Sequence, residues 1–441
     1  MARRTKEKNR AAEDRVVVVD GVRTPFVRAY TDFKDLTAVD LAKVAVRELL
    51  ERVEIDPEQI DEVIMGCVLP SVHSPNVARE VVLGLGLPHR IPGYTLARAC
   101  ASSAQALISA VEGIYAGEYQ VVLVGGTESM SNVPVPYKKS VVDTLQALSR
   151  ARSFPARMKA LSGFNLEDLV PSPPDIAEPA TGKTMGQHAE MMARKNGISR
   201  QAQDEFALRS HQNAAAARQT GKTAEEVCTV WAQPRFEPVD EDNFVRADTT
   251  LEKLSSLKPS FDRRYGTLTA GNSSGLTDGA AALLVMSESK AAELGYKPLV
   301  AVKSWSSVSI DPSEQLLLGP AYAIPEALEK AGLALADMDL VDLHEAFAAQ
   351  VLSVLSKLES VDFAKKELGR DMPVGSIPPE KVNVNGGSIA LGHPFGATGA
   401  RMTLMTAREL ERRKARYGCI SICAAGGMGT AIILERLEAE K

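Results

Sequence analysis

The sequence has no hydrophobic run that approaches the roughly 18 residues needed to span a bilayer. It also has no surplus of positive charge, because 51 Lys and Arg residues stand against 56 Asp and Glu residues. A mildly acidic chain has no bulk attraction to nucleic acid or to an anionic membrane. We therefore expect neither a membrane-spanning helix nor a nucleic-acid partner.

Cysteine is scarce, and the five residues show no zinc-ligand spacing; they lie at positions 67, 100, 228, 419 and 423. An odd number of cysteines suits a reducing compartment better than a disulfide framework. Residues 1–15 mix basic and acidic side chains and lack the apolar segment of a secretion signal. We predict a frayed basic tail over these residues and a cytoplasmic protein.

The 441 residues exceed what a single core usually holds, so two or three domains are expected. Short apolar runs such as 16–19 and 121–124 read as buried strands, and helical spacing occupies 36–50 between them. This alternation predicts an α/β fold. The same order of elements returns from about residue 294, which indicates an internal duplication.

Residues 131–260 differ from the rest of the chain in composition, with clustered prolines and amphipathic helical patterns. We interpret this region as an insertion over a catalytic core. The predicted boundaries are a first half over 16–130 and 261–293, the insertion over 131–260, and a second half over 294–441.

Within the insertion, residues 137–163 contain six basic side chains and one acidic side chain. Apolar residues recur there at helical spacing, as in Phe154, Met158 and Leu161. Such a stretch either lies on a membrane surface, accepts the phosphates of a ligand, or is a solvated face over a packed stripe. The sequence leaves these interpretations open.

The rest of the chain is organised around Cys100, in Thr-Leu-Ala-Arg-Ala-Cys-Ala-Ser-Ser-Ala-Gln-Ala (95–106). Small residues after it predict a helix that opens at the cysteine. Unpaired backbone N–H groups at a helix start favour the thiolate, which is the nucleophilic form. A single cysteine is more often structural, so partners are needed to support this hypothesis.

Three further blocks supply such partners. His393 lies between glycines and a proline in Leu-Gly-His-Pro-Phe-Gly, and a histidine can take a thiol proton. Cys423 ends an apolar strand before Ala-Ala-Gly-Gly, whose N–H groups suit an oxyanion. His344 stands beside Glu345 at the end of another apolar strand.

These blocks together resemble the thiolase family, from Val16 to the C-terminus. The segments at 19–25 (Val-Asp-Gly-Val-Arg-Thr-Pro), 125–130 (Gly-Gly-Thr-Glu-Ser-Met) and 271–275 (Gly-Asn-Ser-Ser-Gly) also match. The sequence looks most like the thiolase (β) subunit of trifunctional fatty-acid β-oxidation complexes. His344 stands where most thiolases have Asn, and His is typical of those subunits.

The resemblance implies a five-layered α-β-α-β-α core of duplicated βαβαβαββ halves, with a mainly helical loop domain inserted in the first half. It implies a 3-ketoacyl-CoA thiolase (acetyl-CoA C-acyltransferase) that forms an acyl thioester. The implied site residues are the nucleophile Cys100, its base His393, the general acid/base Cys423, the oxyanion donor His344, the backbone N–H of Ala425, and Ser274 at the CoA pantetheine.

No metal or tightly bound cofactor is implied, and CoA thioesters are the substrates. Partners implied by the resemblance are further copies in a homodimer or homotetramer, a hydratase/dehydrogenase α subunit, and a peripheral membrane contact through 137–163. The alternatives are a biosynthetic acetoacetyl-CoA thiolase, a decarboxylating ketoacyl-synthase-type enzyme, and a non-catalytic scaffold or membrane-binding subunit. A second catalytic cysteine favours thiolase over the synthase type.

Overall fold

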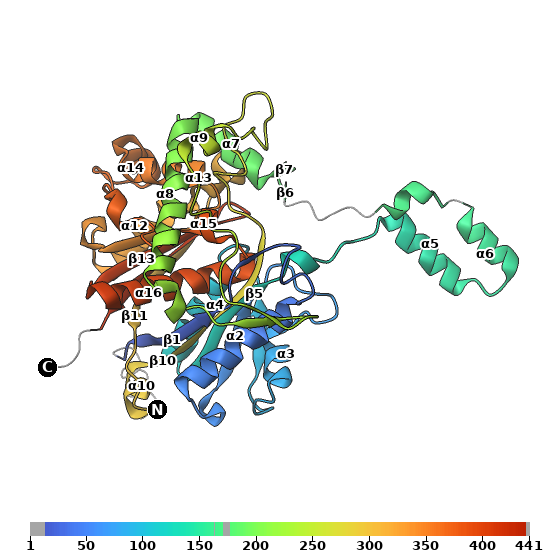
Figure 1. Ribbon diagram of the computed structural model, residues 1–441, viewed down its shortest axis with the longest axis horizontal. Helices are drawn as coiled ribbons and strands as arrows, with labels where there is room; N and C mark the ends of the chain where they lie inside the picture. The colour runs from blue at the N-terminus through green and yellow to red at the C-terminus, as the bar shows by residue number, and fades with distance from the viewer. Residues whose placement is uncertain (1–13, 163, 171–176, 438–441) are drawn as a thin grey trace.

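The structure, a computed structural model, describes residues 14–162, 164–170 and 177–437 (Figure 1). The predicted tail at 1–15 therefore lies almost wholly outside the described residues. One mixed sheet runs through the molecule in the order β4-β3-β5-β10-β1-β11-β14-β13-β12. Its strands are β1 (Val16–Arg23), β3 (Glu62–Gly66), β4 (Gly93–Leu96), β5 (Val121–Glu128), β10 (Thr277–Ser287), β11 (Val300–Ser309), β12 (Leu340–Leu343), β13 (Tyr417–Ala424) and β14 (Met428–Arg436).

The two halves of this sheet repeat the same topology. In the first, β4, β3 and β5 are parallel, and β10 and β1 follow antiparallel. In the second, β12 and β13 are parallel, and β14 and β11 follow antiparallel. A parallel bridge between Val341 and Val382 stands where β4 stands in the first half. The predicted duplication is confirmed, and β1 pairs with β11 to join the halves.

Helices cover each half-sheet on both faces. Helices α2 (Ala38–Val53) and α3 (Val77–Gly84) pack on the outer face of the first half, and α12 (Gly319–Ala331) and α13 (Ala348–Leu358) on that of the second. Helices α4 (Ser102–Ala116) and α16 (Thr398–Arg413) share the core between the halves. Helix α4 carries small and apolar side chains on most of its circumference, as expected of a helix that is covered on all sides. This is the predicted five-layered core.

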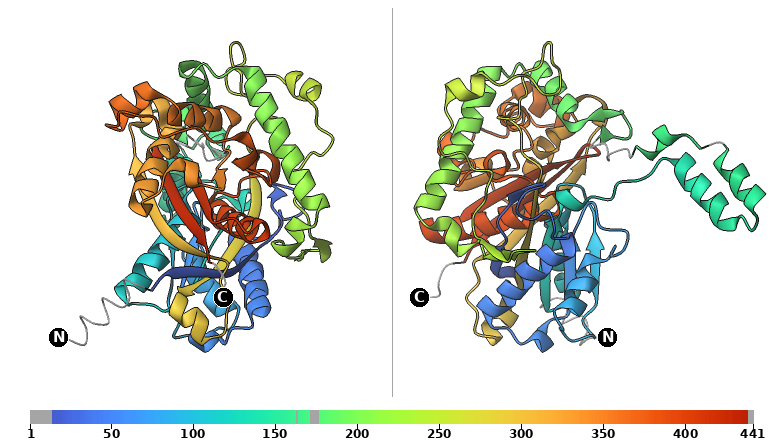
Figure 2. Two further views of the ribbon diagram at one scale, coloured as in Figure 1. Left: turned by 90° about the vertical axis from the view of Figure 1, so that its left-hand side faces the viewer. Right: turned by 45° about the vertical axis from the view of Figure 1, so that its right-hand side comes forward.

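The insertion contains two kinds of helix. Helices α7 (Met185–Lys195) and α8 (Arg200–Gln219) pack on the body, whereas α5 (Lys139–Arg150) and α6 (Phe154–Leu161) form an arm that projects from it (Figures 1 and 2). The remaining elements are β2 (Val27–Arg28), β6 (Ala177–Glu178), β7 (Lys183–Thr184), β8 (Val230–Ala232), β9 (Glu237–Val239), α9 (Leu251–Ser255), α10 (Glu288–Glu293), α11 (Pro312–Gln315), α14 (Val361–Glu367) and α15 (Ser388–Leu391). No helix in the described ranges is long and apolar enough to cross a membrane.

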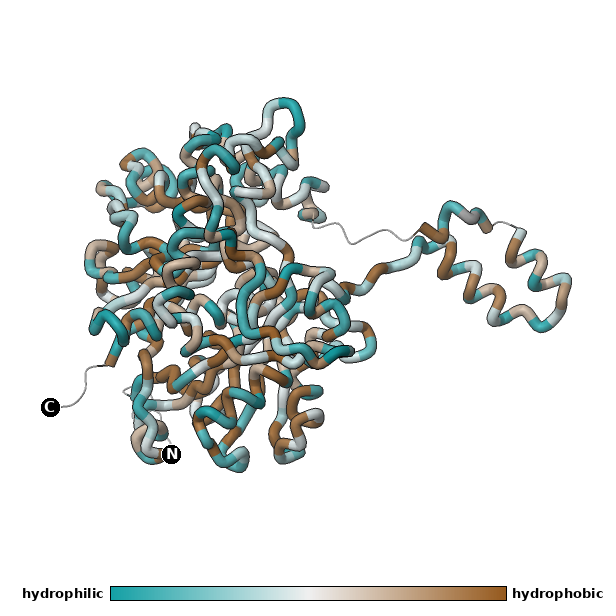
Figure 3. The backbone as a smooth tube through the Cα atoms, viewed as in Figure 1, coloured by the Kyte–Doolittle hydropathy of each residue, from teal (hydrophilic) through white to brown (hydrophobic). Residues whose placement is uncertain are grey.

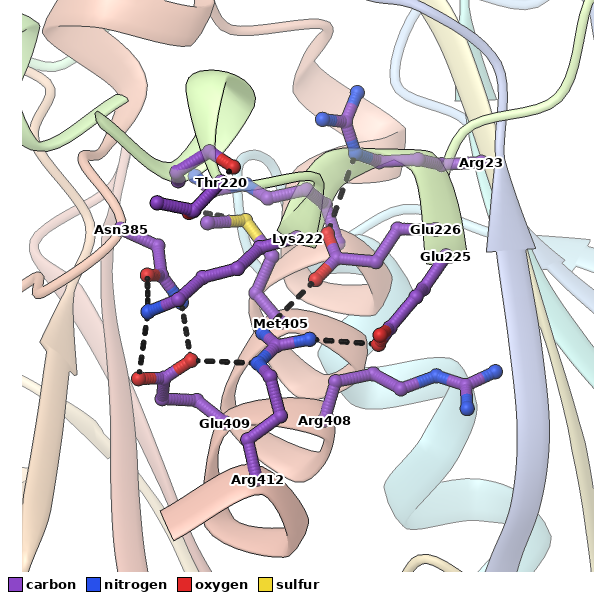
Figure 4. A network of polar contacts seen from close by, with 12 residues as sticks. Arg23, Thr220, Lys222, Glu225, Glu226, Asn385, Met405, Arg408, Glu409 and Arg412 are labelled. Carbon is purple, nitrogen blue, oxygen red and sulfur yellow. Dashed lines mark hydrogen bonds and ion pairs between the residues drawn. The ribbon is translucent and has the colours of Figure 1, made fainter. Parts of the chain in front are cut away.

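A polar network around the buried Glu409 fastens the insertion to α16 (Figure 4). Glu409 accepts hydrogen bonds from Lys222 Nζ at 3.0 Å and Arg412 Nε at 2.9 Å, and Arg412 also reaches Glu225 at 2.8 Å. Burial alone would raise the pKa of Glu409, but these donors, with Asn385 and Arg413, lower it to about 2. The carboxylate is therefore charged at neutral pH and ties the segment after α8 to α16.

Candidate active site

Cys100 lies in a tight turn between β4 and α4. Ala99 has a left-handed φ of 44°, a strained conformation for a residue with a Cβ atom. The hydroxyl of Ser102 holds the turn, because it accepts from Arg98 N at 2.9 Å and donates to Ala99 O at 2.6 Å. The helix begins at Ser102, so the prediction that it opens at Cys100 itself was wrong by two residues.

His393 approaches Cys100 from the other half of the chain. Its Nε2 lies 3.1 Å from Cys100 Sγ, and its Nδ1 lies 2.7 Å from Thr398 Oγ1. Thr398 Oγ1 donates its own hydrogen to Pro394 O, so it accepts from His393 Nδ1–H. The lone pair of Nε2 therefore faces the thiol. Gly392 permits this approach, since it has φ of 95° and a Cβ there would lie 2.2 Å from Thr277.

The charge state of the pair differs from the sequence expectation. Burial raises the pKa of Cys100 to about 12, although the backbone N–H groups of Cys100 and Ala425 lower it in part. Burial, helped by the charge of Arg401, lowers the pKa of His393 to about 3. The N–H groups favour the thiolate, as expected of a helix start, but desolvation outweighs them. The resting pair is a thiol and a neutral imidazole.

Cys423 and Ala425 bring the end of β13 to the same sulfur. Cys423 is buried, and burial followed by the proximity of Cys100 raises its pKa well above the ordinary value. The N–H of Ala425 points at Cys100 Sγ. The turn needs glycine at its next positions, since Gly426 and Gly427 have φ of 81° and 71°. Two cysteines and a directed N–H group thus meet at one point.

His344 completes the cluster from the end of β12. Its ring lies 4.2 Å from that of His393 between centroids, and its side chain is buried. Cys100 Sγ and one ring nitrogen of each histidine lie within 4.8 Å of one another. Cysteine and histidine also bind metal ions, and within the described ranges these three residues are spaced closely enough to hold one. In this chain Cys100 Sγ and His393 Nε2 already contact each other directly.

Ser274 lies at the edge of this cluster, on the loop before β10. Ser274 N donates to Ala346 O at 3.0 Å, and Gly275 O accepts from His393 N at 2.9 Å. The loop is therefore wedged between the His344 block and the His393 block. All six residues selected from the sequence belong to one neighbourhood, to which both halves contribute.

Two buried acids that shape the site were missed in the sequence. Glu128 accepts from the backbone N–H groups of Val68, Leu69 and Gly396, each at 3.0 Å, and so fixes the loop after His393. Glu178, from the insertion, accepts from Gly426 N at 2.7 Å and fixes the turn that bears Ala425. Glu128 belongs to the Gly-Gly-Thr-Glu-Ser-Met segment (125–130) that matches the thiolase family, and this match could have identified it. No local sequence pattern marks Glu178.

Comparison with known proteins agrees with this arrangement. The family described as thiolase, N-terminal domain matches residues 16–289, and the family described as thiolase, C-terminal domain matches residues 296–436. The chain belongs to the thiolase family. Among similar thiolases, a 3-ketoacyl-CoA thiolase of Aliivibrio fischeri and one of Yersinia enterocolitica are each 47% identical over 422 residues. These alignments cover 96% of this chain and 96% and 97% of the two relatives.

Solved thiolase structures share the whole fold. The crystal structure of human mitochondrial 3-ketoacyl-CoA thiolase superimposes with a TM-score of 0.82 at 35% identity, covering 96% of this chain and 99% of that one. The same human enzyme in complex with CoA gives 0.81 at 36% identity, covering 96% and 98%. The acetyl-CoA acetyltransferase of Bacillus anthracis gives 0.81 at 37% identity, covering 96% and 99%. The thiolase architecture predicted from the motifs is confirmed.

Proposed function

We propose that this thiolase is an acetyl-CoA C-acyltransferase that cleaves a 3-ketoacyl-CoA with CoA in fatty-acid β-oxidation. The observation that carries the proposal is the convergence of His393 Nε2, Cys423 and the Ala425 N–H on Cys100 Sγ. A nucleophile, a base, a second proton carrier and an oxyanion donor are what acyl transfer through a thioester requires. Relatives with the name 3-ketoacyl-CoA thiolase over nearly the whole chain support the substrate class.

In the first half-reaction, His393 takes the thiol proton as Cys100 Sγ attacks the 3-keto carbon. Because the resting proton lies firmly on sulfur, transfer accompanies attack, when the forming oxyanion stabilises the imidazolium. His393 and His344 face that oxyanion. The bond between C2 and C3 then breaks, its electron pair forms the acetyl-CoA enolate, and Cys423 protonates C2. The acyl chain remains on Cys100 as a thioester.

In the second half-reaction, the Cys423 thiolate takes the proton of an incoming CoA thiol. The CoA sulfur attacks the thioester, and the N–H groups of Cys100 and Ala425 hold the carbonyl oxygen. Cys100 leaves as a thiolate and regains its proton from His393, which restores the resting pair. The raised pKa of Cys423 fits this role, since the free enzyme keeps the proton that C2 needs.

The experiment that tests this function compares thiolysis rates on 3-ketoacyl-CoAs with chains from four to sixteen carbons, measured as the acetyl-CoA released. A β-oxidation enzyme of the trifunctional branch gives kcat/KM that rises with chain length. A biosynthetic acetoacetyl-CoA thiolase gives its highest kcat/KM on the shortest substrate. A scaffold gives no turnover at any length, which would contradict the proposal.

The acid side of the pH profile reports on His393. Its pKa of about 3 keeps the base neutral at all physiological pH values, whereas an exposed histidine protonates near 6.5. We expect kcat/KM for the 3-ketoacyl-CoA to show no acid limb between pH 8 and pH 5. The check is a kcat/KM profile, with circular dichroism at each pH to confirm that the fold is intact. A limb with an apparent pKa of 6 to 7 would contradict a neutral resting pair.

We further propose that Ser274 contacts the pantetheine arm of CoA and that 131–260 acts as the loop domain over the two halves, with the boundaries predicted above. The wedge of the Ser274 loop between both histidine blocks supports the first assignment. A human thiolase solved with CoA makes CoA the expected ligand of this neighbourhood. A cytoplasmic homodimer or homotetramer, and an α subunit of the trifunctional kind, complete the proposal.

A peripheral membrane contact through the arm is a second proposal. Five side chains on α5 and α6 are both apolar and exposed. They are Val142, Leu145, Phe154, Met158 and Leu161. Figure 3 shows hydrophobic residues alternating with hydrophilic ones along the arm. Exposed apolar clusters of this kind mark interaction surfaces. The packed-stripe interpretation does not fit α6, which buries none of its residues.

Cations on the arm favour an anionic lipid surface. Lys138 pairs with Asp168 and Lys139 with Asp143, whereas the other four cations have no ion pair in the described ranges. These four are Arg150, Arg152, Arg157 and Lys159. Each cation near an anionic surface contributes about 1 kcal/mol, so four give a measurable share of the binding free energy.

Liposome flotation tests the contact. We expect the intact protein to float with vesicles that contain phosphatidylserine, and a variant with those four cations changed to Ser to lose at least about tenfold in partition. The matched control changes four cations on α12, α13 and α14 to Ser, and it therefore has the same net charge as the arm variant. They are Lys330, Lys357, Lys365 and Lys366. Equal flotation of both variants would dismiss the membrane role of the arm.

A further inference from the structure

His344 has one ring nitrogen held and one free. Its Nδ1 lies 3.0 Å from Ser388 Oγ, on α15. Its Nε2 is buried and has no hydrogen-bond partner among the described residues. A buried nitrogen without a partner is costly unless a ligand satisfies it. A ring nitrogen of His344 lies within 4.8 Å of Cys100 Sγ, so a substrate atom bound beside Cys100 would supply the missing partner.

The chemistry of that contact depends on which nitrogen carries the proton. A neutral imidazole donates through one nitrogen and accepts through the other. An oxyanion needs a donor, so His344 serves it only as the Nε2–H tautomer. Burial, with the nearby His393 and Arg401, lowers the pKa of His344 well below 6.5, so the ring is neutral and one tautomer must be selected.

Arg401 decides the direction of the Ser388 hydrogen bond. Its Nη2 lies 2.9 Å from Ser388 Oγ, and the side chain is fully buried beside Asp342, 3.6 Å away. A guanidinium can only donate, so it occupies an acceptor site of the hydroxyl oxygen. The hydroxyl hydrogen then needs an acceptor, and His344 Nδ1 is the one present among residues 14–162, 164–170 and 177–437. Ser388 therefore donates to Nδ1.

The geometry points to Ser388, oriented by the buried cation Arg401, as a positioning residue that holds His344 in its Nε2–H form. Ser388 accepting from His344 instead would leave a buried hydroxyl hydrogen without a partner, which is unfavourable. Thr398 does the reverse for His393, because its own hydrogen is committed to Pro394 O. Two neighbouring histidines are thus kept in opposite tautomers, one as a donor and the other as a base.

The inference rests on the proposed function for its kinetic consequence and not for the tautomer. We expect Ser388→Ala to lower kcat for thiolysis about 10- to 100-fold, the usual effect of losing a partner of a site ligand, with little change in KM. Ser388→Thr, which keeps the hydroxyl, restores much of kcat. The matched control is Ser353→Ala on α13, a buried serine whose hydroxyl donates to Ala349 O; its kcat stays near wild type.

Nitrogen NMR of histidine-labelled protein reads the tautomer directly, and His344→Asn assigns the signal. The expected result is Nε2–H at His344 in the wild type and a mixture or the opposite form in Ser388→Ala. An unchanged tautomer in Ser388→Ala, or Nδ1–H in the wild type, would overturn the inference whatever the kinetics. If the wild type shows the Nε2–H form but cleaves no 3-ketoacyl-CoA, the proposed function fails and the tautomer assignment stands.

Discussion

Cys100→Ser lowers the thiolysis rate by about 10⁴-fold or more and abolishes covalent acyl labelling of the protein. Loss of the nucleophile removes the whole acyl-enzyme pathway, and losses of this size or larger follow removal of such a residue in other enzymes. Serine does not replace it, because a hydroxyl is harder to deprotonate than a thiol and the neighbouring His393 is a weak resting base, with a pKa of about 3. Steady-state kinetics and mass spectrometry of acyl-CoA-treated protein measure the two effects.

The control for this variant is Cys228→Ser, at a buried cysteine on the outer face of the first half. It leaves the reacting group intact, so its turnover stays within a few-fold of wild type. Substantial turnover in Cys100→Ser, or an acyl adduct on another cysteine, would remove Cys100 from the centre of the mechanism.

Cys423→Ser has the second largest effect, a fall in turnover of about 10²- to 10⁴-fold, the usual range for loss of a general acid/base. We expect this variant to lose proton exchange at C2 of acetyl-CoA and to keep the reactivity of the Cys100 thiol. Exchange of the C2 protons of acetyl-CoA with deuterated solvent stops, because no group of suitable pKa delivers or removes that proton. Alkylation of Cys100 by iodoacetamide continues near the wild-type rate, because His393 still contacts its thiol at 3.1 Å.

Deuterium incorporation by NMR and alkylation followed by peptide mapping separate these outcomes. His393→Ala serves as the opposite control, since it loses the base and slows alkylation of Cys100. Persistent proton exchange in Cys423→Ser would assign the second proton carrier to another residue.

Strand periodicity was enough to place most of the sheet, but the sequence interpretation omitted β14 and α13. Residues 428–436 directly follow a Gly-Gly turn, and residues 348–358 directly follow the His344 block; the motif residues themselves predict neither element. The apolar spacing in 137–163 predicted helices correctly. It did not determine what covers them, because periodicity records which residues share a face and not whether the body reaches that face.

The candidate site residues could be selected from the sequence because each lies in a short motif with its own chemistry. The structure adds the properties of the site that depend on contacts with residues far away in the sequence. The resting thiol of Cys100 follows from burial between the halves, which no local pattern records. Glu178 acts on a turn 248 positions away. Arg401 acts through Ser388 on His344, which lies at the end of β12. Residues of this kind become visible only when the halves are assembled.

The most direct test of the acyl-enzyme account mixes the wild-type protein with one 3-ketoacyl-CoA in the absence of free CoA. Acid quench and peptide mapping then locate any adduct. The account predicts one equivalent of acetyl-CoA in a burst and the shortened acyl chain on Cys100, released when CoA is added. Acetyl-CoA formed only when CoA is present, with no covalent adduct at any time, would contradict it.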